Sequence, residues 1–210
     1  MDPTSPPETT SGELSERYPG FNSFKTLAPI HYPKRWFRDA LIQTTFDTSV
    51  MSLSPAPVSF INLRAPVEFA FQIQRLDGSP RLVLLTTGTL PRAWHASVQA
   101  IVLDRRQLLS GPMAMVCRSI WSQQRMPIDP GDQYRCIELI LERGGSVTMG
   151  EAVRVCRRSD LDAVQQVCSM LAQGVLISNL SQGLQPGTIL SIGPKGVRIR
   201  EPDEGRIQKK

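Results

Sequence analysis

The sequence has few of the side chains from which metal and nucleophile sites are built. Its 210 residues include 4 cysteines and 2 histidines. The cysteines never form the closely spaced pair of a zinc site, and neither histidine stands near a second metal-ligating residue. These side chains are Cys117, Cys136, Cys156, Cys168, His31 and His95. Three of the cysteines fall at apolar positions of expected helices, where a free thiol acts as a small hydrophobe. We therefore expect no metal and no cofactor.

The chain also lacks long apolar runs. The longest, such as residues 82–85, fall far short of the roughly 20 residues that span a bilayer. The first residues, MDPTSPPE, hold no basic stretch followed by an apolar one, as a secretory signal would. We expect no membrane contact and a cytoplasmic location.

Charge of neither sign dominates, although basic residues are in mild excess. Lys and Arg number 24 against 19 Asp and Glu, which gives a formal net charge of +5. This excess permits contact with nucleic acid without demanding it. The basic residues gather at positions 34–35, 105–106 and 157–158 and in the C-terminal tail. A solvated surface is the simple alternative to a nucleic-acid site.

Regular patterns begin after a polar lead. Residues 1–24 are rich in Pro, Ser, Thr and Glu, which predicts a disordered segment. Apolar residues at helical spacing then predict a helix from residue 34 to 45. Its inward stripe consists of Trp36, Phe37, Ala40 and Leu41. The segment EFAFQIQRL alternates apolar and polar residues, Asp77 and Gly78 form a hairpin turn, and RLVLLTT follows as a strand buried on both faces.

Beyond this hairpin we expect a helix from Pro91 to Leu108, with Trp94, Val98 and Ile101 on one face. The segment PMAMVCRSI predicts a further strand that returns beside the buried one. Helix, hairpin, helix and strand together predict an α/β domain with a mixed sheet over residues 25–126.

A different pattern follows a Pro-, Gly- and Asp-rich linker at residues 127–132. We expect three short helices. The first covers 133–143 and ends at Gly144, the second is capped by Thr148, and the third is capped by Ser159 and ends at Gly174. The segments VLISNL and TILSIG then predict two strands. This order is typical of a winged helix, which we place at 133–195, with a basic tail at 196–210.

This arrangement resembles the TnsA-type transposon endonuclease subunit, which joins a restriction-endonuclease-like α/β nuclease to a C-terminal winged helix. The closest local match is LDAVQQVCSMLAQGVLISNLSQGLQPGTIL. It is similar to the family's helix ending in a leucine pair and glycine, then strand, turn and T-x-L. In the nuclease half, APVEFAFQIQRLDGSPRLVLLTT stands where the family carries a Pro-Asp-Phe strand, an Asp-Gly turn and a strand ending Glu-Val-Lys. The resemblance covers roughly residues 30–192.

The departures from that family concern its chemistry. Such a nuclease needs two carboxylates to hold a divalent metal and a lysine to position the attacking water. Here Asp39 and Glu68 are the nearest carboxylates, and residues 81–89 contain no acidic residue and no lysine. Without these groups the electrostatic term that dominates such catalysis is lost. We therefore expect a nuclease scaffold without catalytic residues, and a residual metal-dependent nuclease is the least favoured alternative.

The resemblance implies a non-catalytic DNA-associated protein, a regulatory or assembly factor of a mobile element or DNA-processing system, with double-stranded DNA as partner. In the third helix we expect Leu161, Val164, Cys168 and Leu171 to face inward, which leaves its glutamines and Ser169 outward. The candidate DNA-binding residues are Arg154, Arg157, Arg158, Gln165, Gln166, Ser169, Lys195, Arg198 and Arg200. Because Asp160 and Asp162 would repel phosphate, the alternative is a regulator whose winged helix binds a protein partner or a second copy of the chain.

Overall fold

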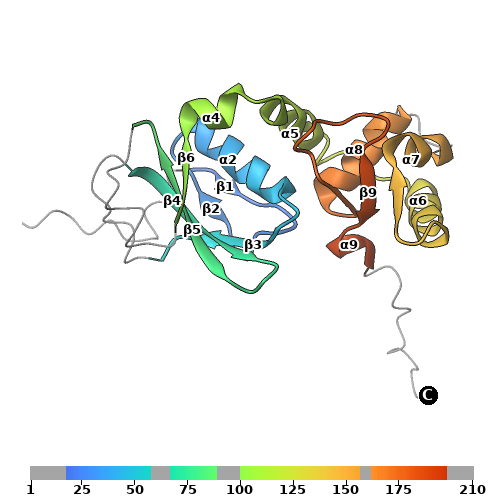
Figure 1. The fold of residues 1–210 in the computed structure, drawn as a ribbon, viewed down its shortest axis with the longest axis horizontal. Helices are drawn as coiled ribbons and strands as arrows, with labels where there is room; N and C mark the ends of the chain where they lie inside the picture. The colour runs from blue at the N-terminus through green and yellow to red at the C-terminus, as the bar shows by residue number, and fades with distance from the viewer. Residues whose placement is uncertain (1–17, 58–66, 89–99, 157–161, 198–210) are drawn as a thin grey trace, which may run out of the picture.

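The computed structural model describes residues 18–57, 67–88, 100–156 and 162–197 (Figure 1). Within these ranges the chain is mixed α/β. A four-stranded mixed sheet with helices forms the N-terminal part, and a small antiparallel sheet with helices forms the C-terminal part. None of the helices in these ranges is long and apolar enough to cross a membrane.

The N-terminal part contains two sheets. Its strands are β1 (Gly20–Phe21), β2 (Ile30–His31), β3 (Val50–Pro55), β4 (Val67–Arg75), β5 (Pro80–Thr86) and β6 (Ala100–Asp104). Its helices are α2 (Arg35–Phe46), α4 (Arg105–Ser110) and α5 (Pro112–Ser122). β1 pairs with β2, and the larger sheet has the order β3-β4-β5-β6. Its β3–β4 and β4–β5 pairs are antiparallel, whereas β5 and β6 are parallel.

Helix α2 covers one face of this sheet, as its apolar stripe predicts. The alternation along β4 puts Phe69 and Phe71 on that face, where they pair in register with Leu85 and Val83 of β5. The rings of Phe37 and Phe69 stack with centroids 4.8 Å apart. The predicted helix, hairpin and buried strand are therefore confirmed, and Gly78 adopts the positive φ of 78° that the turn requires.

Two predicted elements after the hairpin are wrong. The predicted helix from Pro91 cannot reach Leu108, because Ala100–Asp104 is strand β6, parallel to β5. Residues 89–99 lie outside the described residues. PMAMVCRSI is helix α5, since Pro112 stands in its first turn and Ala114, Cys117 and Trp121 are buried along one side. Strand β6, and not this segment, lies beside β5.

The prediction of a disordered lead over residues 1–24 is wrong for residues 18–24. Phe21 pairs in β1, is 3% exposed and stacks on Trp121 of α5 with ring centroids 4.9 Å apart. Phe24 lies directly against Gly174 in the C-terminal part. These aromatic side chains supply the apolar area that the rest of the lead lacks. Residues 1–17 lie outside the described residues.

The C-terminal part is made of short helices and three strands. These are α6 (Pro130–Glu142), β7 (Ser146–Thr148), α7 (Met149–Val155), α8 (Ala163–Gln173), β8 (Leu176–Ser178), β9 (Ile189–Ile192) and α9 (Pro194–Val197). The sheet order is β7-β9-β8, with antiparallel pairs. The predicted helices and strands β8 and β9 are present, whereas β7 was not predicted.

Capping residues set the helix limits. The Thr148 side chain accepts from the Glu151 backbone N–H, and the Glu151 carboxylate accepts from the Thr148 N–H, which is a complete capping box. Gly174 ends α8 with a φ of 78°. Helix α8 begins later than predicted, because Asp162 and not Ser159 is its N-cap. Ser159 lies outside the described residues.

The two parts pack against each other without a free linker. Pro130 already belongs to α6, and helices α5 and α8 contact each other across the boundary. One hydrophobic cluster runs from Phe21 through Trp121 to Leu190. The predicted linker at residues 127–132 is therefore wrong from Pro130 onward. In its first half, Pro127 and Asp129 are hydrogen-bonded to the Gln166 side chain of α8.

Candidate functional site

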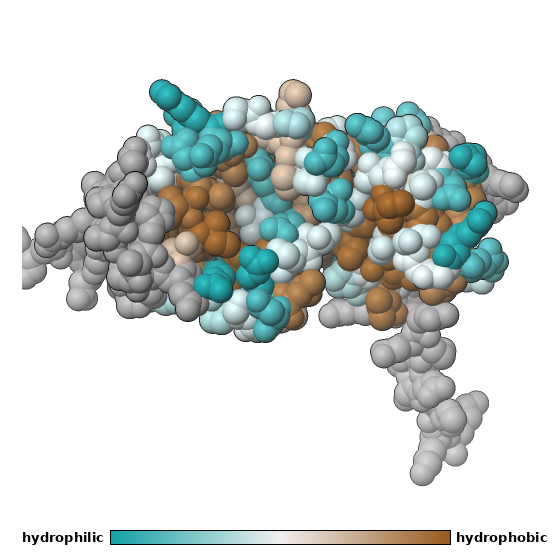
Figure 2. All heavy atoms as spheres, in the orientation of Figure 1, coloured by the Kyte–Doolittle hydropathy of each residue, from teal (hydrophilic) through white to brown (hydrophobic). Residues whose placement is uncertain are grey.

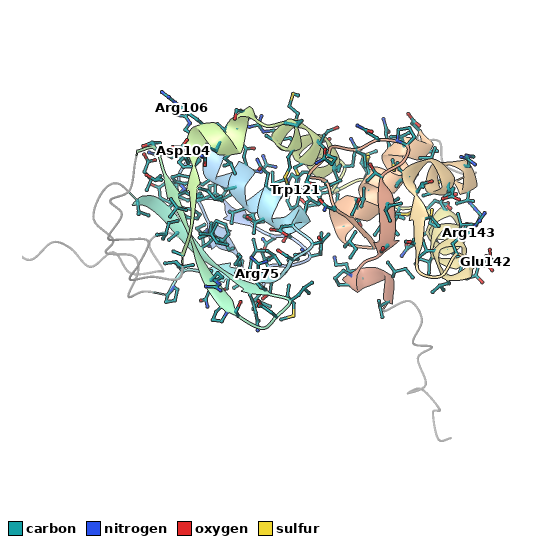
Figure 3. All side chains as sticks on the ribbon, viewed as in Figure 1. Arg75, Asp104, Arg106, Trp121, Glu142 and Arg143 are labelled. Carbon is teal, nitrogen blue, oxygen red and sulfur yellow. The ribbon has the colours of Figure 1, made fainter. Side chains whose placement is uncertain are left out.

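The edge of the large sheet where the TnsA resemblance implies a metal site carries few acidic groups. At this edge β5 and β6 end side by side, with Thr86 in register with Asp104. Strand β4 starts there, and a register shift between Val67 and Phe69 falls at Glu68. Asp104 and Arg106 mark this edge in Figure 3. The Asp104 carboxylate accepts from the backbone N–H groups of Arg106 and Gln107, so it serves as the N-cap of α4.

Glu68 is held by two neighbours. Lys34 Nζ donates to Glu68 Oε2 at 2.6 Å, and Thr87 Oγ1 donates to Glu68 Oε1 at 2.6 Å. These two hydrogen bonds, that of Lys34 above all, lower the pKa of the Glu68 carboxyl. Both carboxylate oxygens are thus engaged by this chain's own side chains.

Asp39 of α2 binds a different cation. Arg118 of α5 donates from Nε to Oδ1 and from Nη2 to Oδ2, each at 2.8 Å. This two-pronged pairing joins α2 to α5 and raises the pKa of the Arg118 guanidinium. Asp39 and Glu68 do not hydrogen-bond each other, and no group of three or more metal-ligating side chains gathers within the part of the chain that the structure describes.

Three of the four cysteines and two tryptophans are buried in the part of the chain that the structure describes. Cys117, Cys136 and Cys168 are buried, and the thiols of Cys136 and Cys156 lie 3.8 Å apart. Trp36 and Trp121 are core residues. His31 Nδ1 lies 2.9 Å from the Tyr18 carbonyl oxygen. His95 and Trp94 lie outside the described residues.

The structure divides the predicted DNA-binding residues into three groups. Arg154 on α7, Gln165 on α8 and Lys195 on α9 are exposed. Gln166 and Ser169 are 1% and 0% exposed, so the prediction that they face a partner is wrong. The remaining residues lie outside the described ranges: they are Arg157, Arg158, Arg198 and Arg200.

The buried polar side of α8 holds the segment that connects the two parts. Gln166 Oε1 accepts from the Asp129 N–H at 3.1 Å, and its Nε2 donates to the Pro127 carbonyl at 3.4 Å. Ser169 Oγ donates to the Gln123 carbonyl at 3.2 Å. Buried amide and hydroxyl groups need such partners, and an irregular segment offers free backbone groups.

The outward side of α8 is consequently narrow. Gln173 donates from Nε2 to the Met126 carbonyl at 2.7 Å, so its side chain also holds the connecting segment. Val164, predicted to face inward, is 42% exposed. The exposed residues at the start of α8 are Asp162, Val164 and Gln165. They comprise one acid, one apolar side chain and one amide.

In comparisons with protein-family models and with curated proteins, no match to the chain was found. The resemblance to the TnsA-type subunit therefore rests on the sequence patterns alone.

Proposed function

We propose that this chain is a non-catalytic DNA-associated protein in which a restriction-endonuclease-like sheet carries a winged helix. The observation that supports this most directly is the connectivity of the C-terminal part. We interpret the order α6-β7-α7-α8-β8-β9, with β9 between β7 and β8, as a winged helix. Folds built on the helix-turn-helix commonly dock on duplex DNA. By the TnsA resemblance, the role would be regulation or assembly in a mobile element or DNA-processing system.

The absence of catalysis in this proposal rests on how the carboxylates are engaged. A metal-dependent nuclease needs carboxylate oxygens directed at a shared ion. Glu68 binds Lys34 and Thr87, and Asp39 binds Arg118. Strand β5 ends in Leu84, Leu85 and Thr86, where the family's Glu-x-Lys would stand.

The burial of Gln166 and Ser169 changes the expected mode of binding. Without them, α8 has little with which to read base edges. Arg154 and Lys195 are the basic candidates on the described C-terminal surface, and side chains of this type contact phosphates. The proposal therefore assigns the C-terminal part a backbone-directed contact with duplex DNA.

The test is a fluorescence anisotropy titration of a labelled random-sequence duplex at several salt concentrations. Replacing Arg154 and Lys195 by glutamine should weaken binding to every sequence alike and reduce the salt slope by about one unit for each phosphate that is no longer neutralised. Glu138 and Glu142, both exposed on α6, provide control substitutions to glutamine that remove acidic charge instead. If the parent chain does not bind the duplex at about 50 mM salt, DNA association is refuted.

Catalysis is tested separately with plasmid DNA and magnesium or manganese. We expect no cleavage by the purified chain. Metal-dependent cutting that is abolished by Glu68→Ala or Asp39→Ala would contradict the non-catalytic proposal.

A second candidate function, a protein-interaction module, is favoured by the exposed start of α8. Asp162 disfavours phosphate there, and Val164 offers apolar surface. If a second copy of the chain is the partner, sedimentation should show a dimer that Val164→Glu dissociates, while DNA binding stays unchanged. A monomer at all concentrations would exclude the second copy as partner.

A further inference from the structure

An arginine-lined groove lies in the N-terminal part of the chain. It runs between α2, α4 and α5 and has a volume of about 590 Å³. Four arginines and one aspartate line it: Arg35, Arg38, Arg105, Arg118 and Asp39. A second groove of about 710 Å³ adjoins it, since Arg105 and Leu109 line both. This second groove adds Arg106 and reaches Thr87 at the edge of the sheet.

Most of the arginines in these grooves form no ion pair among the described residues, although Arg105, after Lys34, lies close enough to Glu68 to lower the pKa of that carboxyl. Asp39 binds Arg118, which is the groove's one ion pair among the residues described. Arg35, Arg38 and Arg105 form no ion pair within those same ranges. Asp104 lines the second groove and caps α4 through its Oδ1, and it forms no ion pair with a groove arginine among the described residues. Because these arginines line one groove, an anion that contacts several of them at once gains attraction from each.

The shape of the patch suits an extended anion. Arg35 and Arg38 are three residues apart on α2 and therefore share one side of that helix. Figure 2 shows hydrophilic side chains gathered over α4, and Figure 3 shows Arg106 directed outward from this helix. Guanidinium groups bind phosphate oxygens in two-pronged geometry and are less strongly hydrated than ammonium groups.

The floor of the groove indicates how DNA would be held. Trp36 and Trp121 line it but are 7% and 6% exposed, so neither ring offers a face on which a base could stack. Single-stranded nucleic acid is typically held by such stacking. Because the arginines are accessible and the tryptophan rings are buried, the groove favours contact with the phosphates of a duplex over stacking with bases.

We propose that the arginine-lined groove between α2, α4 and α5 binds the phosphate backbone of duplex DNA as a second contact surface. This inference rests on the proposed function, because it assumes that the chain associates with DNA. It adds a site in the nuclease-like part, formed by Arg35, Arg38 and Arg105, that reads no sequence.

The experiment compares the full chain with a groove variant, Arg38→Gln with Arg105→Gln. The matched control, Arg75→Gln with Arg81→Gln, removes the same charge from β4 and β5, and neither residue lines either of these grooves. Figure 3 shows Arg75 far from α4. Affinity for a duplex of about 20 base pairs is measured between about 50 and 200 mM salt. A third variant, Arg38→Lys with Arg105→Lys, keeps the charge. Thermal melting verifies that each variant folds.

We expect the groove variant to lower the salt slope by about two units, because each phosphate contact contributes about 0.9. The control and the lysine variant should stay within about half a unit of the parent, by the same scale. Equal slopes for groove variant and control would overturn the groove while leaving the proposed function intact. A lysine variant as impaired as the glutamine variant would also overturn it, since charge would then not be the cause. A parent that binds no DNA would refute the proposed function itself, and the groove with it.

Discussion

The contact between Phe24 and Gly174 predicts a large effect of one added methyl group. Gly174 ends α8 with a φ of 78°, which disfavours any residue with a Cβ. A Cβ at this position would also lie 2.4 Å from Cγ and 2.5 Å from Cδ2 of Phe24. We therefore expect Gly174→Ala to destabilise the chain through both backbone strain and overpacking.

The two contributions can be separated with a second glycine. Backbone strain costs about 1 kcal/mol, and overpacking typically costs about 1–3 kcal/mol. Gly174→Ala should therefore lower the free energy of unfolding by about 2–4 kcal/mol. Gly144 has the same φ of 78° with nothing within 4 Å of its added Cβ. Gly144→Ala should then cost about 1 kcal/mol, the backbone strain alone.

Urea denaturation of the full chain measures both effects, provided the m-values stay constant. Phe24→Ala should partly relieve the overpacking, so the double variant Phe24→Ala with Gly174→Ala should be less destabilised than the two single variants combined. Equal destabilisation by Gly174→Ala and Gly144→Ala would refute the reasoning. The segment around Phe24 would then not pack on the C-terminal part in solution.

Three further predictions concern local interactions. Thr148→Ala removes the capping box of α7 and should cost about 1 kcal/mol in thermal melts; an unchanged melting temperature would contradict this. Burial lowers the pKa of Lys25 to about 8, so the contribution of this lysine to the free energy of unfolding should rise with pH between about 8 and about 10. In pH-dependent urea titrations the parent should therefore gain stability relative to Lys25→Met over this window, and a constant difference would contradict the burial. The hydrogen bond with Cys136 lowers the pKa of Cys156, and burial raises that of Cys117 to about 12. Alkylation of the folded chain followed by mass spectrometry should therefore label Cys156 before Cys117, and the reverse order would count against this environment.

Elements with strong local signals could be predicted from the sequence. Helix α2 shows a regular apolar stripe, and β4 alternates with period two up to the turn at Gly78. Thr148 and Gly174 mark helix ends by their capping chemistry. In each case the decisive contacts lie within a few residues along the chain, so the pattern contains the information.

The two wrong elements lacked such a signal. AIVLD is a short apolar run that periodicity cannot assign to helix or strand, and its strand state depends on pairing with β5. PMAMVCRSI carries apolar residues that fit both patterns, although Pro112 at its start favours a helix. The pairing of β6 with β5 decided which of the two segments forms the strand, and the sequence does not display such long-range pairing.

The error on α8 has a different origin. Polar residues such as Gln166 and Ser169 are expected at the surface, because burial costs free energy unless each group finds a partner. Here the partners are backbone groups of the segment at 123–129, far away in sequence. The groove arginines could be predicted only in part. Residues 34–35 and 105–106 stand out as basic pairs, but only the fold brings Arg38 and Arg118 beside them.

The packing of α8 bears on the kind of DNA contact that this chain can make. A recognition helix reads sequence by placing several side chains in the major groove. The exposed start of α8 presents Asp162, Val164 and Gln165, of which the glutamine is the conventional base reader. If the groove arginines contact phosphates as proposed, such contacts fix position without selecting sequence. A chain that binds in this way needs a partner to choose the site. We therefore expect it to act as an assembly factor in a larger complex and not as a sequence-specific regulator on its own.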